Sequence, residues 1–162
     1  MSYDLVITGG KVVDGTGSTP FLADIAINDG VIVNVGESLD TEGAHVIDAG
    51  DKIVTPGFVD IHTHYDGQAT WDGLLEPSSG HGVTTVVMGN CGVGFAPVKP
   101  GQEEWLIQLM EGVEDIPGSA LSAGLDWQWE TFPEYLDAID KKPHAMDIGC
   151  QIAHGPLRAY VM

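Results

Sequence analysis

A pair of histidines and one cysteine are the residues of this sequence whose types and spacing suggest chemistry. His62 and His64 stand one residue apart, directly after a short apolar run at residues 58–61. Alternate residues of a strand share a face, so a strand over residues 58–64 would point both imidazoles to the same side. Two imidazoles held side by side suit a divalent metal such as zinc. The sequence therefore predicts a metal-binding pair, against the alternative of two surface histidines that follow a strand.

Cys91 is the third candidate ligand, because it follows the next apolar run. Residues 83–88 are rich in β-branched side chains, which is typical of a buried parallel strand, and Cys91 stands among Gly89, Gly92 and Gly94. The two histidines and Cys91 follow successive strands that we expect to be parallel, and the carboxyl ends of neighbouring parallel strands lie at the same edge of a sheet, so we expect Cys91 beside the histidines. Two imidazoles and a thiolate are good zinc ligands. Taken alone, the cysteine is better explained as a small buried residue in a tight glycine turn, and it is the histidine pair one strand away that favours a ligand.

Short strands must position these residues. The apolar pattern predicts three parallel strands, over residues 58–64, 83–88 and 145–153. Residues 1–55 read as a small antiparallel β unit without an evident catalytic group. Within it, Gly9-Gly10 is expected to be a turn between strands over residues 5–8 and 11–13, and Asn28-Asp29-Gly30 is a hairpin signal.

Two helices are expected between Cys91 and the third strand. Residues 102–113 are amphipathic, residues 115–130 show no helical period, and Thr131-x-x-Glu134 is a capping box that starts the second helix. The apolar side chains expected on the first helix are Trp105, Leu109 and Val113, with Leu106 and Met110 beside them, and those on the second are Phe132, Leu136 and Ile139.

Composition excludes some classes of partner. The 162 residues include 24 acidic and 6 basic side chains, for a formal charge of −18, which repels nucleic acid and anionic membrane surfaces. The N-terminus lacks the positive region of a signal peptide, and two cysteines without an export signal predict a cytoplasmic protein.

Several segments resemble one enzyme family. Residues 56–64, Pro-Gly-Phe-Val-Asp-Ile-His-Thr-His, resemble the first barrel strand of the amidohydrolase superfamily. Residues 83–97, with Cys91 after the second strand, are similar to the N-acyl-D-amino-acid deacylases, or D-aminoacylases, of that superfamily. Further similar segments are residues 112–118, 129–136 and 154–158. The resemblance implies an α/β fold, with a small N-terminal β-sandwich portion over residues 1–55. Residues 56–162 would then form the first three βα units of a (β/α)8, TIM-like barrel that is incomplete in this chain.

The same resemblance implies a zinc-dependent hydrolase that acts on the amide bond of N-acyl-D-amino acids. One or two Zn²⁺ ions would be bound, with His62, His64 and Cys91 among their ligands. The remaining ligands and the general-base aspartate are expected beyond residue 162, so the 162-residue chain alone is expected to be inactive. Asp66 and His154 are candidates for contact with the small-molecule substrate, and a structural role is the alternative for His154.

Two other functions fit part of the pattern. One is a cyclic-amide hydrolase of the same superfamily, similar to dihydropyrimidinase. Cys91 argues against it, since those enzymes usually bridge their metals with a lysine. The other is a non-catalytic zinc-binding fragment, because three ligands suffice to bind zinc weakly.

Overall fold

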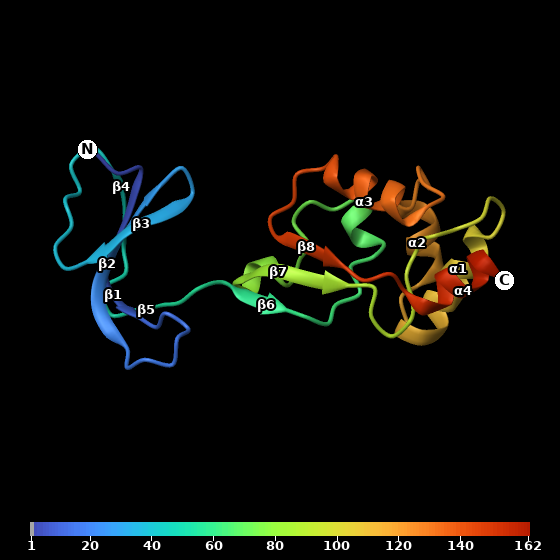
Figure 1. Ribbon diagram of the computed structural model, residues 1–162, viewed down its shortest axis with the longest axis horizontal. Coiled ribbons are helices and arrows are strands. Elements are labelled where there is room, and N and C mark those ends of the chain that lie inside the picture. The colour runs from blue at the N-terminus through green and yellow to red at the C-terminus, as the bar shows by residue number, and fades with distance from the viewer. Residues whose placement is uncertain (1) are drawn as a thin grey trace. The chain divides into compact units, whose positions relative to one another are not determined.

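A computed structural model describes residues 2–162 of the chain (Figure 1). It divides the chain into two compact units, the first ending at Pro56 and the second running from Gly57 to Met162. Each unit has its own sheet, and only the second contains helices.

The first unit is a five-stranded sheet. Its strands are β1 (Leu5–Val12), β2 (Phe21–Asn28), β3 (Val31–Gly36), β4 (His45–Asp48) and β5 (Ile53–Val54). They lie in the order β3-β2-β1-β4, and β5 pairs with β1. Asp29 and Gly30 both have positive φ angles, 48° and 74°, so they form the two-residue turn expected between β2 and β3.

Two expectations for the first unit were wrong. Residues 5–13 were expected to form two strands, but β1 is continuous and has an irregular register between Ile7 and Gly10. Gly9 has a φ of 69°, so the glycine pair makes a bulge in one strand instead of a turn between two. The sheet is also mixed, because β4 and β5 return to pair with β1 in parallel.

The second unit is built on three parallel strands in the order β6-β7-β8 (Figure 1). Strand β7 (Val83–Met88) confirms the expected range, whereas β6 (Phe58–Asp60) and β8 (Asp147–Cys150) are shorter than expected. The prediction of a strand through residue 64 was therefore wrong. Continuous ladder pairing with β7 covers residues 58–60 only, and strand extent depends on such pairing.

Three helices lie between β7 and β8, namely α1 (Glu103–Glu114), α2 (Gly118–Gly124) and α3 (Phe132–Asp140). A fourth helix, α4 (His154–Val161), follows β8. Two 3₁₀ turns, η1 (Gln68–Thr70) and η2 (Ser79–His81), precede β7. The capping box of α3 is confirmed, with Thr131 as its N-cap. Helix α2 lies in a stretch whose sequence shows no helical period.

The buried faces of α1 and α3 confirm the expected ones in part. Helix α1 buries Leu106 and Met110, as expected, together with Ile107, while Trp105 and Val113 are 45% and 49% exposed. The apolar stripe is wide, and packing selects one side of it. The buried residues of α3 are Tyr135 and Ile139, and Leu136 is 39% exposed.

Aromatic side chains, among them Trp129 and Tyr135, fill the core between the helices and the Cys91 loop. Trp129 Nε1 donates a hydrogen bond of 2.7 Å to the Phe95 carbonyl, and the Tyr135 hydroxyl donates one of 2.6 Å to the Asp66 carbonyl. Both side chains are at most 6% exposed. Burial of these large rings with their polar atoms satisfied ties the loops after β6 and β7 to α3.

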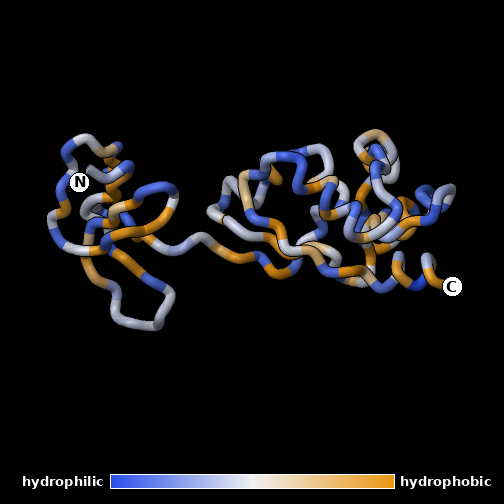
Figure 2. Tube along the Cα trace, turned by 45° about the horizontal axis from the view of Figure 1, so that its top comes forward, coloured by the Kyte–Doolittle hydropathy of each residue, from blue (hydrophilic) through white to orange (hydrophobic). Residues whose placement is uncertain are grey.

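Strand β6 is hydrophobic and yet open to solvent. Phe58 and Val59 are 60% and 59% exposed, although neighbours on a strand face opposite sides. Figure 2 shows hydrophobic residues along this part of the chain. Parallel strands are normally covered on both faces, and β6 is covered on neither.

None of the helices in residues 2–162 combines the length and the apolar character that crossing a membrane requires.

Candidate metal centre

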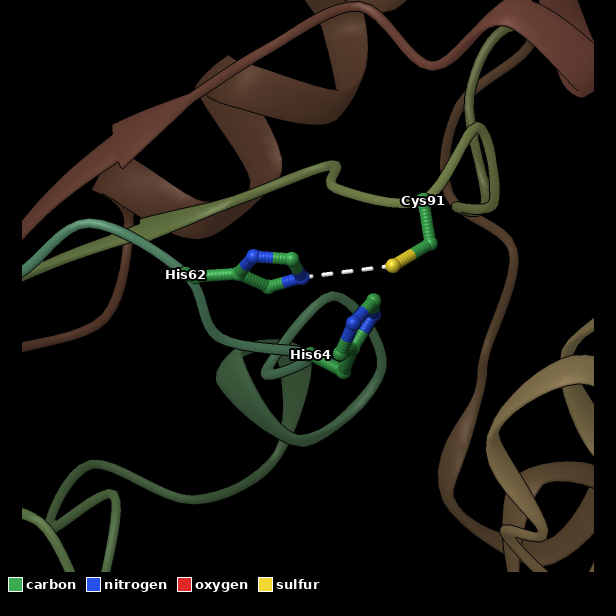
Figure 3. Close-up of side chains that lie close together, drawn as sticks. All are labelled: His62, His64 and Cys91. Atoms are coloured by element: carbon green, nitrogen blue, oxygen red, sulfur yellow. Dashed lines mark hydrogen bonds between the residues drawn. The ribbon is translucent and has the colours of Figure 1, made fainter.

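His62, His64 and Cys91 lie together where β6 and β7 end (Figure 3). One ligand atom from each residue lies within 4.8 Å of the other two. The Nε2 atom of His62 is 3.2 Å from the Sγ atom of Cys91, and the two imidazole ring centres are 5.5 Å apart. The structure thus brings together the three residues predicted as metal ligands.

Thr63 holds the two histidines in place, which a longer strand was expected to do. Its backbone N–H and its hydroxyl both donate to the carbonyl of Val87 on β7, at 3.0 Å and 2.9 Å. Thr63 is 8% exposed, so the residue between the histidines is anchored inward. The His62 N–H also donates to the Asp60 carboxylate, at 3.1 Å.

A glycine turn and one asparagine position Cys91. A Cβ atom on Gly89 would collide with the carbonyl oxygen of Gln151, so only glycine fits where β7 ends. Asn90 Nδ2 donates to the carbonyls of Thr63 and Val87, at 3.2 Å and 2.9 Å, and thereby joins the cysteine loop to the histidine segment. Cys91 itself has a positive φ of 53°, a strained conformation of the kind that clusters at functional sites.

The chemistry of the donor set fits a divalent metal. Partial burial lowers the pKa of His64, an effect that the neighbouring His62 reinforces and Glu114 opposes, so the neutral, metal-binding form is favoured. The Nδ1 atom of His64 is buried and has no hydrogen-bond partner. Loss of hydration and the negative charge of Glu114 raise the pKa of the Cys91 thiol, and a bound cation would reverse that effect.

Glu114 is the residue at this site that sequence reasoning missed. Its Oε2 atom lies 3.3 Å from the Nε2 atom of His64. It ends α1, and an acidic residue in the last turn of a helix is opposed by the helix dipole. That conflict was the one signal in the sequence that pointed to it.

Asp66 and His154, the predicted substrate contacts, lie in different surroundings. Asp66 is 1% exposed beside Gly94, and burial raises its pKa to about 7, while one of its oxygens, Oδ2, has no partner. His154 was expected at the end of a strand, but it is the first residue of α4 and is exposed. It lines a cavity of about 490 Å³ together with Cys91, Trp105 and Arg158.

Comparison with known proteins places the chain in a family. The model of the amidohydrolase family matches residues 45–162, which include all three candidate ligands. The chain belongs to the amidohydrolase family. An uncharacterised protein of Mycobacterium tuberculosis is 37% identical to this amidohydrolase over 166 residues, covering 100% of the chain. D-aminoacylase of Alcaligenes xylosoxydans xylosoxydans is 33% identical over 160 residues, covering 99% of it.

Solved structures agree with this assignment. A crystal structure of D-aminoacylase matches 99% of this amidohydrolase chain with a TM-score of 0.78 and 34% identity. N-acyl-D-glutamate deacylase of Bordetella bronchiseptica, complexed with zinc and a phosphonate that mimics the tetrahedral intermediate, matches 100% of it with a TM-score of 0.73 and 32% identity. The chain spans 27% and 31% of the two relatives, and 31% and 32% of the two structures.

Proposed function

We propose that this amidohydrolase chain is the metal-binding part of a zinc-dependent enzyme that hydrolyses the amide bond of N-acyl-D-amino acids. The cluster of His62, His64 and Cys91 carries the proposal, because two imidazoles and a thiolate form a donor set that suits zinc. The similarity to D-aminoacylase and to N-acyl-D-glutamate deacylase, over nearly all of the chain, supports the substrate class.

For the whole protein we propose a (β/α)8, TIM-like barrel. Residues 56–162 would supply its first three βα units, and residues 1–55 would form part of a β-sandwich. The parallel order β6-β7-β8 supports this, since consecutive strands are neighbours in such a barrel. The exposure of Phe58 and Val59 on both faces of β6 supports it as well, because a closed barrel would cover both faces.

The residues of the centre have separable tasks in this proposal. His62, His64 and Cys91 would hold one or two zinc ions. The chemistry that a zinc ion would supply there is a lowered pKa for a bound water and polarisation of the substrate carbonyl. The general base that moves a proton from this water to the leaving amine would be an aspartate beyond residue 162. His154, which lines the apolar cavity beside Cys91, would contact the acyl group of the substrate. Asp66, buried beside Gly94, would support the site from within instead of contacting the substrate.

The proposed partner is a small N-acyl amino acid. The formal charge of −18 argues against nucleic acid and anionic membrane surfaces as partners. We also propose a cytoplasmic location, because Cys91 and Cys150 are free thiols and the cytoplasm keeps thiols reduced.

The test uses the full-length protein made from its native gene and loaded with zinc. Hydrolysis of N-acetyl-D-leucine and N-acetyl-D-glutamate is measured beside that of the L enantiomers. We expect hydrolysis of D substrates only, lost in Cys91→Ala and retained in Cys150→Ala. Hydrolysis of dihydrouracil instead would favour a cyclic-amide hydrolase, and no hydrolysis by a zinc-loaded protein would overturn the proposal.

A further inference from the structure

Glu114 reaches the candidate metal centre from an element that contributes none of the three ligands. It is the last residue of α1, and its Oε2 atom lies 3.3 Å from the Nε2 atom of His64. The two side chains are 20% and 16% exposed, so the contact is largely shielded from water. In residues 2–162 this is the one contact between a basic and an acidic side chain at ion-pair distance.

The charge of this carboxylate lacks compensation. A partly buried carboxylate needs a positive partner, and no lysine or arginine within the described part of the chain lies at ion-pair distance from Glu114. His64, the side chain in contact with it, is itself a candidate metal ligand, and Cys91, its other neighbour, carries no positive charge in either protonation state.

The helix end makes the site still more negative. The last carbonyl groups of α1 carry the negative end of the helix dipole, and no basic residue occupies the last turn. Glu114 and the C-cap Asp115 therefore stand where acidic side chains destabilise a helix. A divalent cation beside His64 would relieve all of these repulsions together.

We propose that Glu114 is the supporting carboxylate of the metal centre: it positions His64 and supplies negative charge that raises the affinity of the site for a divalent cation. Carboxylates that contact a metal-binding histidine orient the ring and increase its basicity. This inference rests on the proposed zinc centre, and it assigns Glu114 a positioning role.

The test is a zinc titration of the metal-stripped protein against a chelator of known affinity. We expect Glu114→Gln, which keeps the size of the side chain and removes its charge, to weaken zinc binding about 10- to 100-fold. Glu114→Asp keeps the charge and should recover part of the loss. Glu104→Gln, on the exposed first turn of the same helix, changes the net charge equally and should leave the affinity within about twofold.

Cobalt absorption separates positioning from a general loss of structure. When cobalt replaces zinc, the bond from the Cys91 thiolate to cobalt gives an absorption band. In Glu114→Gln this band should still form at saturating cobalt, because Cys91 is unchanged, but its wavelength should shift. Equal zinc affinity in Glu114→Gln and the unsubstituted protein would overturn the role of Glu114 while leaving the zinc centre intact. Failure of the unsubstituted protein to bind zinc would overturn the centre itself.

Discussion

The Nε2 atom of His62 lies 3.2 Å from the Sγ atom of Cys91, although 29 positions separate the two residues in the chain. This contact joins the segment after β6 to the loop after β7. Both segments are held by the same acceptor, the Val87 carbonyl, which receives hydrogen bonds from Thr63 and Asn90. The centre is therefore supported independently of any bound metal.

Replacement of Cys91 tests the ligand set directly. Cys91→Ala removes one of the three donors, so we expect zinc affinity to fall by more than the roughly 10- to 100-fold that loss of a supporting residue causes. The matched control is Cys150→Ala, which removes the other free thiol, at the end of β8 and outside the cluster. Isothermal titration with zinc checks both variants. Equal loss in the two would show that the thiol at position 91 has no special role.

The hydroxyl of Tyr135 tests how the histidine segment is tied to α3. Tyr135→Phe leaves the buried Asp66 carbonyl without its 2.6 Å donor, so we expect a loss of about 1–3 kcal/mol in the free energy of unfolding. Tyr160→Phe is the control, because its hydroxyl donates to Glu130 at an exposed position, and we expect a change within about 0.5 kcal/mol. Urea unfolding measures both. A Tyr135 variant as stable as the Tyr160 variant would contradict the assignment.

The capping box of α3 predicts a pH-dependent contribution to stability. The backbone N–H groups of Thr131 and Glu130 donate to the Glu134 carboxylate, at 2.8 Å and 3.0 Å, and lower the pKa of Glu134 below its usual 4.5. Since the pKa is lower in the folded state, the contribution is fully present above pH 4.5. It is lost as the pH falls through the lowered folded value.

Glu134→Gln should therefore destabilise the protein above pH 4.5, and the difference should shrink as the pH falls below that value. Asp137→Asn, an exposed position on the same helix, serves as the control. Unfolding by urea at a series of pH values gives the comparison. A stability difference that stays constant with pH would rule out a role for the Glu134 charge.

The open strand β6 predicts how a polypeptide of residues 1–162 behaves alone. Its exposed apolar residues and unpaired edge form a surface for self-association. Val59→Lys should reduce association, since a charge on an edge strand opposes pairing with another chain. Val161→Lys, on a residue of similar exposure in α4, should have little effect. Sedimentation velocity checks this, and a monodisperse monomer without any substitution would contradict it.

The local chemistry of this protein could be predicted from its sequence. The His62 and His64 pair, the cysteine in its glycine turn and the capping box at Thr131 are short patterns whose physical meaning depends on adjacent residues. The same holds for the turn at Asp29 and Gly30, which requires positive φ angles. These patterns sufficed to predict the ligands and the parallel strands that bring them together.

Tertiary structure alone decided where elements end and which distant residues meet. Strand β6 stops at Asp60 because its continuous ladder with β7 stops there, and separate hydrogen bonds from Thr63 to Val87 then position the histidines. Helix α1 packs through Leu106, Ile107 and Met110 and leaves Trp105 and Val113 exposed, and in this orientation Glu114 contacts His64. Strand extent and helix orientation depend on partners far along the chain, and the residues of one segment do not encode those partners.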